Sequence, residues 1–65
     1  MKNYIKQYRK QYKLTQEELA NILGVTRQTI IAIENDKYNP TLELAMGLAK
    51  YLKVPVEELF VLSQK

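Results

Sequence analysis

The chain has 65 residues, 46% of them hydrophobic, and a net charge of +3 with a pI near 9.3, which predicts one small basic domain over residues 1–65 that suits an anionic partner. It contains no cysteine and no histidine, which excludes disulfides, the usual zinc sites and histidine-based catalysis, so no metal and no cofactor are expected. No apolar run reaches the roughly 20 residues of a membrane span and no signal-peptide pattern opens the chain, so we expect a soluble cytoplasmic protein with no evident small-molecule ligand.

The first predicted helix runs from about Lys2 to Tyr12. Its apolar residues Ile5, Tyr8 and Tyr12 recur at spacings of three and four, which is one face of a helix. This segment and the turn after it carry a run of basic residues with no acid among them: Lys2, Lys6, Arg9, Lys10 and Lys13. Taken alone, such a run is most simply a solvated helix face.

The second predicted helix begins after Thr15, a good N-cap residue that forms a capping box with Glu18 three positions later. Gly24 is suited to end it in a left-handed conformation. Between Thr15 and Gly24, the buried stripe of this helix is formed by Leu19, Ala20 and Leu23.

The third predicted helix starts at its N-cap Thr26 and runs to about Asn35, with Ile30 and Ile33 facing inward. The two helices and the short turn at Gly24 form a helix-turn-helix over about residues 16–35.

A turn-rich loop follows, because Pro40 forces Asn39 out of the helical region. Thr41 is expected to cap a fourth helix, and Pro55 suits the start of a short fifth helix. The core face of the fourth helix is predicted to be Leu42, Ala45, Leu48, Ala49 and Leu52, and the fifth helix carries Val56, Leu59 and Phe60. No β alternation is sustained, so the predicted fold class is all-α, a compact five-helix bundle.

The outward face of the third helix carries the residues with the clearest chemistry. At about 100° per residue, Arg27, Gln28, Ile31 and Ala32 fall within an arc of roughly 140°, on the side away from Ile30 and Ile33. Arg can donate two hydrogen bonds to guanine, Gln can pair with adenine, and a small or apolar side chain can contact a thymine methyl. This pattern predicts a helix that reads bases in the major groove of DNA, although the same residues on an arbitrary helix would be ordinary solvated surface.

Contacts to the DNA backbone are expected on either side of this helix. Gln16 lies at the start of the second helix, where free N–H groups favour a phosphate. The loop after the third helix offers further polar side chains, at Asn35, Lys37, Tyr38 and Asn39, and the alternative is that this loop is a plain connector.

Several segments, in order, strongly resemble the lambda-repressor/Cro type of helix-turn-helix, the XRE family. They are LTQEELA at 14–20, GVTRQTI at 24–30, IENDKYNPTL at 33–42 and VPVEELF at 54–60, so the resemblance covers nearly the whole chain. It implies a small stand-alone five-helix domain that acts on operator DNA, usually as a homodimer and often as a repressor.

By position, the resemblance assigns roles to individual residues. Base contacts would fall on Thr26, Arg27, Gln28 and Ala32, and phosphate contacts on Gln16, Thr29, Asn35, Lys37 and Tyr38. Arg9 and Glu34 would form a structural ion pair. The chain departs from the family at Lys13, where glycine is frequent, so the turn before the second helix is expected to be strained or differently shaped.

Dimerisation would need an apolar surface, and the candidate is the unbroken run Leu59, Phe60, Val61 and Leu62, with Tyr51 expected nearby in the fold. The alternative is that this run closes the core of the monomer, with Leu59 the first choice for a core residue.

The sequence therefore predicts a sequence-specific, double-stranded-DNA-binding transcriptional regulator, a homodimeric repressor of a palindromic operator. The alternative function is an antitoxin or another protein-interaction module with the same fold. The absence of Cys and His, of a phosphate-binding glycine loop and of a carboxylate cluster argues against an enzyme.

Overall fold

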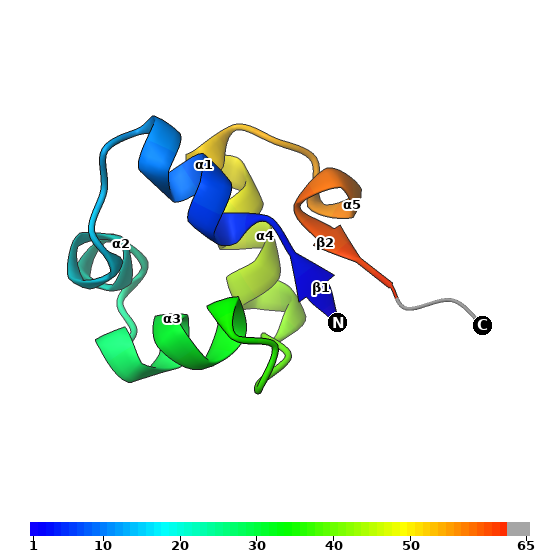
Figure 1. Ribbon diagram of the computed structural model, residues 1–65, viewed down its shortest axis with the longest axis horizontal. Coiled ribbons are helices and arrows are strands. Elements are labelled where there is room, and N and C mark those ends of the chain that lie inside the picture. The colour runs from blue at the N-terminus through cyan, green and yellow to red at the C-terminus, as the bar shows by residue number, and fades with distance from the viewer. Residues whose placement is uncertain (63–65) are drawn as a thin grey trace.

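The computed structural model describes residues 1–62, which form five helices and two strands of two residues each (Figure 1). The elements, in chain order, are β1 (Lys2–Asn3), α1 (Ile5–Gln11), α2 (Gln16–Leu23), α3 (Arg27–Glu34), α4 (Leu42–Leu52), α5 (Val56–Leu59) and β2 (Phe60–Val61). The predicted all-α class is confirmed, and the strands are a local addition to it.

Three threonines begin three of the helices, as predicted. The backbone N–H of Glu18 donates to Thr15 Oγ1 at 3.0 Å, and the Glu18 carboxylate accepts from the Thr15 N–H at 2.8 Å, which completes the capping box of α2. Thr26 and Thr41 accept in the same way at the starts of α3 and α4, at 3.3 and 3.2 Å. These caps satisfy N–H groups that the first turn of a helix cannot pair internally.

Four residues in turns are left-handed, and one of them is Asp36 in the loop after α3, with φ 61°. Gly24 ends α2 with φ 73°, as predicted. Lys13, in the turn before α2, has φ 57°, and Lys53, after α4, has φ 61°. A side chain with a Cβ is disfavoured in this region, so the strain expected at Lys13 is present, and Lys53 carries the same strain.

The predicted start of the first helix at Lys2 is wrong. Lys2 and Asn3 instead pair antiparallel with β2, opposite Val61 and Phe60 respectively, and the helix begins at Ile5. Asn3 Oδ1 accepts from the Ile5 N–H at 3.1 Å and so supports the first turn of α1. The pairing brings the two ends of the described chain side by side (Figure 1).

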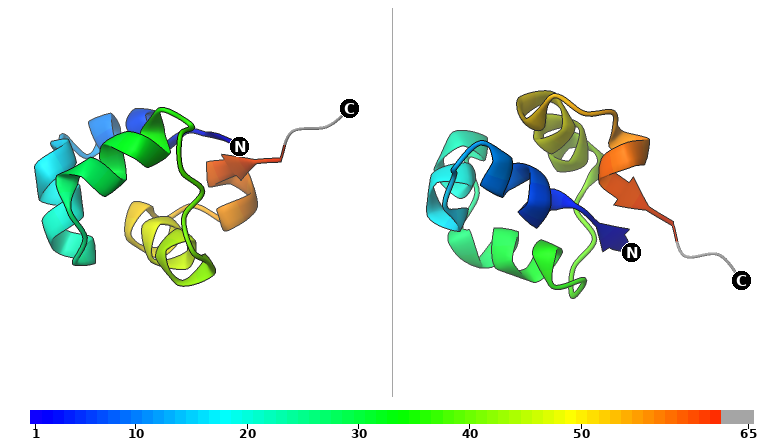
Figure 2. Two further views of the ribbon diagram at one scale, coloured as in Figure 1. Left: turned by 90° about the horizontal axis from the view of Figure 1, so that it is seen from below. Right: turned by 45° about the horizontal axis from the view of Figure 1, so that its top comes forward.

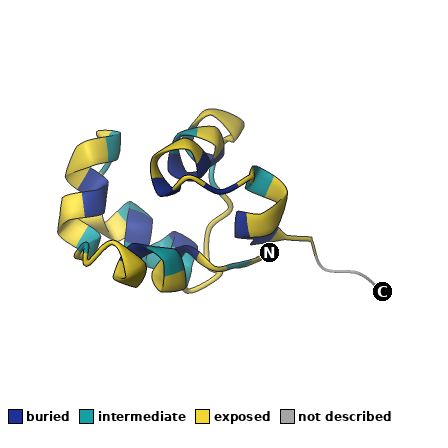
Figure 3. Cartoon of the chain, turned by 90° about the horizontal axis from the view of Figure 1, so that it is seen from above, coloured by how far each residue is buried: buried dark blue, intermediate teal, exposed yellow. Residues whose placement is uncertain are grey.

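The helices enclose one core, shown by the dark blue segments in Figure 3. The prediction that Leu42 belongs to the core is wrong. This residue is 72% exposed in the first turn of α4, and Leu44 packs against the core instead. The largest fully buried side chains are Ile5, Leu19, Ile30, Ile33, Leu48, Leu52 and Leu59.

Figures 1 and 2 show how the helices are arranged around this core. Helices α2 and α3 lie at one end of the molecule and cross at a steep angle, while α5 and the strands lie at the other. One face of α3 is consequently left without a covering element, whereas its other face packs on the core through Ile30 and Ile33. Within residues 1–62, no helix is long and apolar enough to cross a lipid bilayer.

Candidate nucleic-acid interface

The open face of α3 begins with two polar side chains. Arg27 and Gln28 are exposed, and Ile31 and Ala32, one turn later, are half-buried on the same side of the helix. The N-cap Thr26 is also exposed, and its hydroxyl lies 3.0 Å from that of Thr29. The structure therefore places the side chains for which sequence predicted base contacts on one helix face, with the long polar side chains at the start of the helix.

The position of α3 is fixed by a buried ion pair with α1. Arg9 Nε donates to Glu34 Oε2 at 2.8 Å and Arg9 Nη2 donates to Glu34 Oε1 at 3.2 Å, with the two side chains only 9% and 4% exposed. Arg9 Nη1 donates to the Leu14 carbonyl at 2.8 Å. The pair anticipated from the sequence thus joins α1, the turn after it and the last residue of α3.

Gln16 belongs to the same network, which sequence analysis did not anticipate. Its Nε2 donates to Glu34 Oε1 at 3.1 Å, so the Glu34 carboxylate accepts from both Arg9 and Gln16. The side chain is half-buried rather than extended into solvent. Because an amide carries two N–H groups and one carbonyl, Gln16 keeps a donor and an acceptor beyond this bond.

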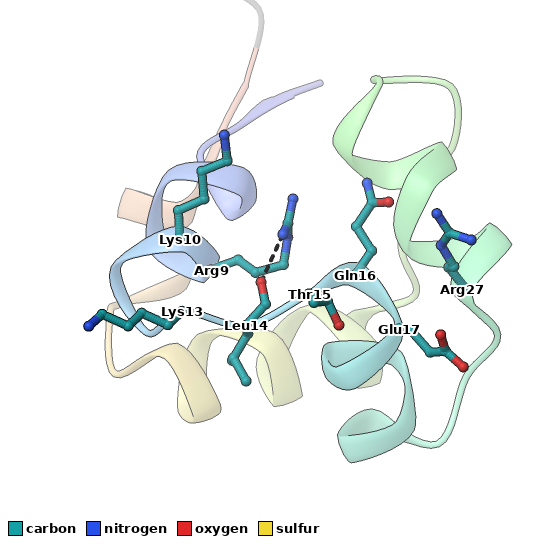
Figure 4. A pocket seen from close by; sticks show the side chains of 8 residues that line it. All are labelled: Arg9, Lys10, Lys13, Leu14, Thr15, Gln16, Glu17 and Arg27. Atoms are coloured by element: carbon teal, nitrogen blue, oxygen red, sulfur yellow. Dashed lines mark hydrogen bonds between the residues drawn. The ribbon is translucent and has the colours of Figure 1, made fainter.

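A hollow of about 600 Å³ lies between α1, α2 and the start of α3. We call it the basic hollow (Figure 4), and its lining residues are Arg9, Lys10, Lys13, Leu14, Thr15, Gln16, Glu17 and Arg27. Figure 4 shows Gln16 and Arg27 projecting from neighbouring helices, with Arg9 extending between α1 and α2. Since Glu34 neutralises Arg9, the basic character of the hollow comes from Lys10, Lys13 and Arg27, opposed by Glu17.

Lys10 and Lys13 were not assigned a role from the sequence, where they belong only to a basic run. They line the same hollow as Gln16 and Arg27, and the chain turns at Lys13 between α1 and α2. The signal in the sequence was the run itself, which lacks any acid, but its position relative to α3 required the fold.

The loop after α3 is exposed, and its first residues are hydrogen-bonded to α3 and to β1. Asn35, Lys37, Tyr38 and Asn39 are all exposed, as a backbone-contacting loop requires. The Lys37 N–H donates to the Ala32 carbonyl at 2.9 Å, which folds the loop back on α3.

Asn3 of β1 also bonds to the start of this loop, by a contact that sequence analysis missed. Asn3 Nδ2 donates to the Ile33 carbonyl at 2.8 Å and to Asp36 Oδ1 at 3.1 Å. The partners lie about half the chain away from Asn3, so no local pattern indicates them.

The predicted dimer run divides into two parts. Leu59 and Phe60 are buried, at 0% and 7% exposure, and belong to the core of this chain. Val61 and Leu62 are 37% and 68% exposed. An aspartate at position 60 would place a charge in the core, so the buried Phe60 is not suited to a dimer surface. Tyr51 does not line the same hollow as Leu62; it lines another one, together with Tyr12 and Ile22.

Other site types find little support in the part of the chain that the structure describes. Residues 1–62 hold no group of three or more acidic side chains that could bind a metal ion. Within the same residues, every buried side-chain nitrogen or oxygen has a hydrogen-bond partner. The polar groups that remain available for a ligand are therefore exposed or partly exposed ones.

Comparison with known proteins gives a consistent result. The helix-turn-helix family profile matches residues 5–59. The chain is 56% identical over 61 residues to an uncharacterised HTH-type transcriptional regulator of Methanocaldococcus jannaschii. The matched region covers 94% of this chain and 92% of that protein. The chain is 48% identical over 65 residues to another such regulator, of Methanothermobacter thermautotrophicus, with 98% and 94% covered. It is 42% identical over 55 residues to the cryptic phage CTXphi transcriptional repressor RstR of Vibrio cholerae, covering 85% of this chain and 50% of that protein.

Proposed function

The chain belongs to the helix-turn-helix family of DNA-binding transcriptional regulators, which are not enzymes, and from this premise we propose that it is a repressor that binds a palindromic operator as a homodimer. The proposal has three parts: how bases are read, how the DNA backbone is held, and how two copies assemble.

The observation that carries the proposal is the first turn of α3, where Arg27 and Gln28 are both exposed while Ile30 and Ile33 are buried. With α3 in the major groove, Arg27 would donate to guanine O6 and N7, and Gln28 would pair with adenine N6 and N7. Ile31 and Ala32, half-buried one turn later, are suited to contact a thymine methyl. Each bidentate pair is expected to contribute about 1–3 kcal/mol of discrimination against other bases.

The phosphate contacts would come from both flanks of α3. On one side lie Lys10, Lys13 and Gln16 of the basic hollow, and Gln16 is already oriented by its bond to Glu34. On the other lies the exposed loop, with Asn35, Lys37, Tyr38 and Asn39, while Thr29 sits beside the N-cap of α3. Such contacts fix the position of the protein on the duplex without reading sequence.

Two half-sites are needed because one small module contacts few base pairs, and dimers usually bind half-sites about 34 Å apart. Val61 and Leu62 are exposed at the end of the described chain, and Leu62 lines an apolar hollow together with the exposed Leu42. We place the dimer contact on this surface. Occupancy of the operator would then repress transcription. Repression is the activity named for the phage relative.

The test is selection of binding sites from random duplex DNA at two salt concentrations. Wild type is expected to enrich a palindrome whose half-sites lie about one helical turn apart. Weak, salt-sensitive binding with no enriched sequence would contradict the proposal and favour the protein-interaction alternative, an antitoxin among others.

Two variants make the test specific to base reading. Arg27→Lys keeps the charge but loses the planar fork that matches guanine, and Gln28→Ala removes no charge at all. Each is expected to relax selection at one base position of each half-site while the salt dependence stays that of wild type. A uniform loss of affinity across sequences would instead assign these side chains to the backbone.

A further inference from the structure

A second hollow, of about 590 Å³, lies between the C-terminal halves of α2 and α4 and shares no residue with the basic hollow. We call it the Gly47 hollow; it is lined by Tyr12, Ile22, Leu23, Gly47 and Tyr51 together with Lys50 and Lys53. Tyr12, Ile22 and Tyr51 are 44%, 45% and 41% exposed, although they are large and largely apolar. The Tyr12 hydroxyl donates to the Leu52 carbonyl at 3.2 Å, which holds its ring at this surface.

Gly47 is not required by the packing of the chain itself. It lies inside α4, where glycine is a poorer helix former than any residue except proline. A Cβ built at this position would lie 3.5 Å from Leu23 Cδ2, an ordinary van der Waals contact. Alanine would therefore fit and favour the helix. The glycine leaves the floor of the hollow open to a group from outside the chain.

Lys53, just after the same helix, is also a residue that its backbone conformation disfavours. It adopts φ 61°, a conformation in which glycine is favoured and a lysine is strained. Two residues that line one hollow thus depart from what their backbone conformation prefers. Departures of this kind are expected where function opposes local stability.

The charge of the hollow indicates what would occupy it. Among its lining residues, all within the described chain, Lys50 and Lys53 are basic and none is acidic. Apolar surface with two cations is complementary to a segment that carries apolar and acidic side chains together. A two-fold contact between two copies of this face would bring like charges together. Duplex DNA offers phosphates but no apolar side chains for the floor.

We propose that the Gly47 hollow docks an acidic amphipathic segment of another protein. Its apolar side chains would cover Ile22 and Tyr51 and approach α4 closely at Gly47, and its carboxylates would pair with Lys50 and Lys53. This role does not depend on DNA binding, because the two surfaces share no residue.

The experiment is selection from a phage-displayed peptide library on the purified full chain, with counter-selection on Lys50→Glu. We expect enriched peptides that combine acidic and apolar residues. In an NMR titration, one such peptide should shift the amide signals of Ile22, Gly47 and Tyr51 and leave those of Arg27 and Gln28 unchanged. Binding should weaken about tenfold in Lys50→Glu and remain unchanged in the matched control Lys6→Glu.

Gly47→Ala separates docking from a structural need for glycine. It is expected to raise the melting temperature and at the same time weaken peptide binding. A lower melting temperature would show that the fold needs the glycine and would overturn the proposal. The proposal would also be overturned if the selection enriches no acidic peptides that prefer wild type to Lys50→Glu. It would likewise be overturned if sedimentation shows that the chain is a dimer and that Ile22→Glu, on this face, abolishes the dimer.

Discussion

Arg9 and Glu34 are 25 positions apart in the sequence, yet their side chains meet in a two-point ion pair at 2.8 and 3.2 Å, almost out of contact with solvent. The pair fastens the end of α3 to α1, and a further bond from Gln16 to Glu34 adds α2. The relative positions of the three helices around the basic hollow therefore depend on one carboxylate.

The first prediction concerns the removal of that carboxylate. Glu34→Gln leaves the Arg9 charge buried without a counter-charge, which is expected to lower the free energy of unfolding by about 3–5 kcal/mol. Urea unfolding followed by circular dichroism measures the loss, and a domain this small is expected to be largely unfolded by it. Glu17→Gln, at an exposed position of α2, is the matched control and should change stability by less than about 0.5 kcal/mol.

The double variant Arg9→Met/Glu34→Leu tests the mechanism. An apolar pair of similar volume needs no counter-charge, so it is expected to recover most of the stability lost in Glu34→Gln. If the double variant is as unstable as the single one, the ion pair contributes through its specific geometry rather than through mutual neutralisation.

The second prediction concerns the left-handed lysine beside the basic hollow. Lys13→Gly relieves the positive φ and is expected to raise the free energy of unfolding by about 1 kcal/mol. It also removes a proposed phosphate contact, so the slope of log affinity against log salt for operator DNA should fall by about 1. Thermal unfolding and titrations at several salt concentrations measure the two effects.

Lys53→Gly is its matched control, because Lys53 has nearly the same φ but lines the other hollow. It should stabilise the chain to a similar degree and leave the salt slope unchanged. An equal fall in slope for both variants would mean that the slope follows net charge and not contact.

The third prediction separates the core half of the C-terminal apolar run from its exposed half. Leu62→Asp and Val61→Asp are expected to give folded monomers with much weaker operator binding, because these side chains are exposed on the proposed dimer surface. Phe60→Asp is expected to unfold the chain, since it buries a charge. Sedimentation velocity and circular dichroism distinguish the outcomes. Dimers that persist in Leu62→Asp and Val61→Asp would place the interface elsewhere.

The fourth prediction concerns the start of α2. Thr15→Ala removes the acceptor for the Glu18 N–H and is expected to destabilise the chain by about 1 kcal/mol, measured by thermal unfolding. Glu18→Gln keeps a side-chain acceptor for the Thr15 N–H and should have a smaller effect. Equal losses in both variants would show that the charge of the Glu18 carboxylate contributes as much as the Thr15 hydroxyl.

The parts of the fold that the sequence predicted are those governed by local chemistry. Thr15, Thr26 and Thr41 mark helix starts, and Gly24 marks a helix end, because capping depends on residues within a few positions. The outward position of Arg27 follows in the same way from helical periodicity.

What the sequence did not predict depends on distant partners. The helix expected from Lys2 loses its first turn because those residues pair with β2, near the other end of the chain. Leu42 satisfies the apolar period of α4 but lies before the point where that helix meets the core. Gln16 was expected to reach a phosphate directly, and its bond to Glu34 needed the placement of α3. A lysine at position 53 does not indicate a left-handed conformation, because glycine is the residue that usually adopts this conformation at a helix end.

The pairing of β1 with β2 has a consequence for the order of folding. Contacts within α2 and α3 close short loops, whereas joining Lys2 to Val61 requires nearly the whole chain to be ordered. We therefore expect the strands to form after the helices have packed, and substitutions in them to accelerate unfolding more than they slow folding. Asn3, which links β1 to the end of α3, belongs to this last-formed region. Transient opening of the native chain is expected to begin there, with the amide hydrogens of the strand pair exchanging before those of α2.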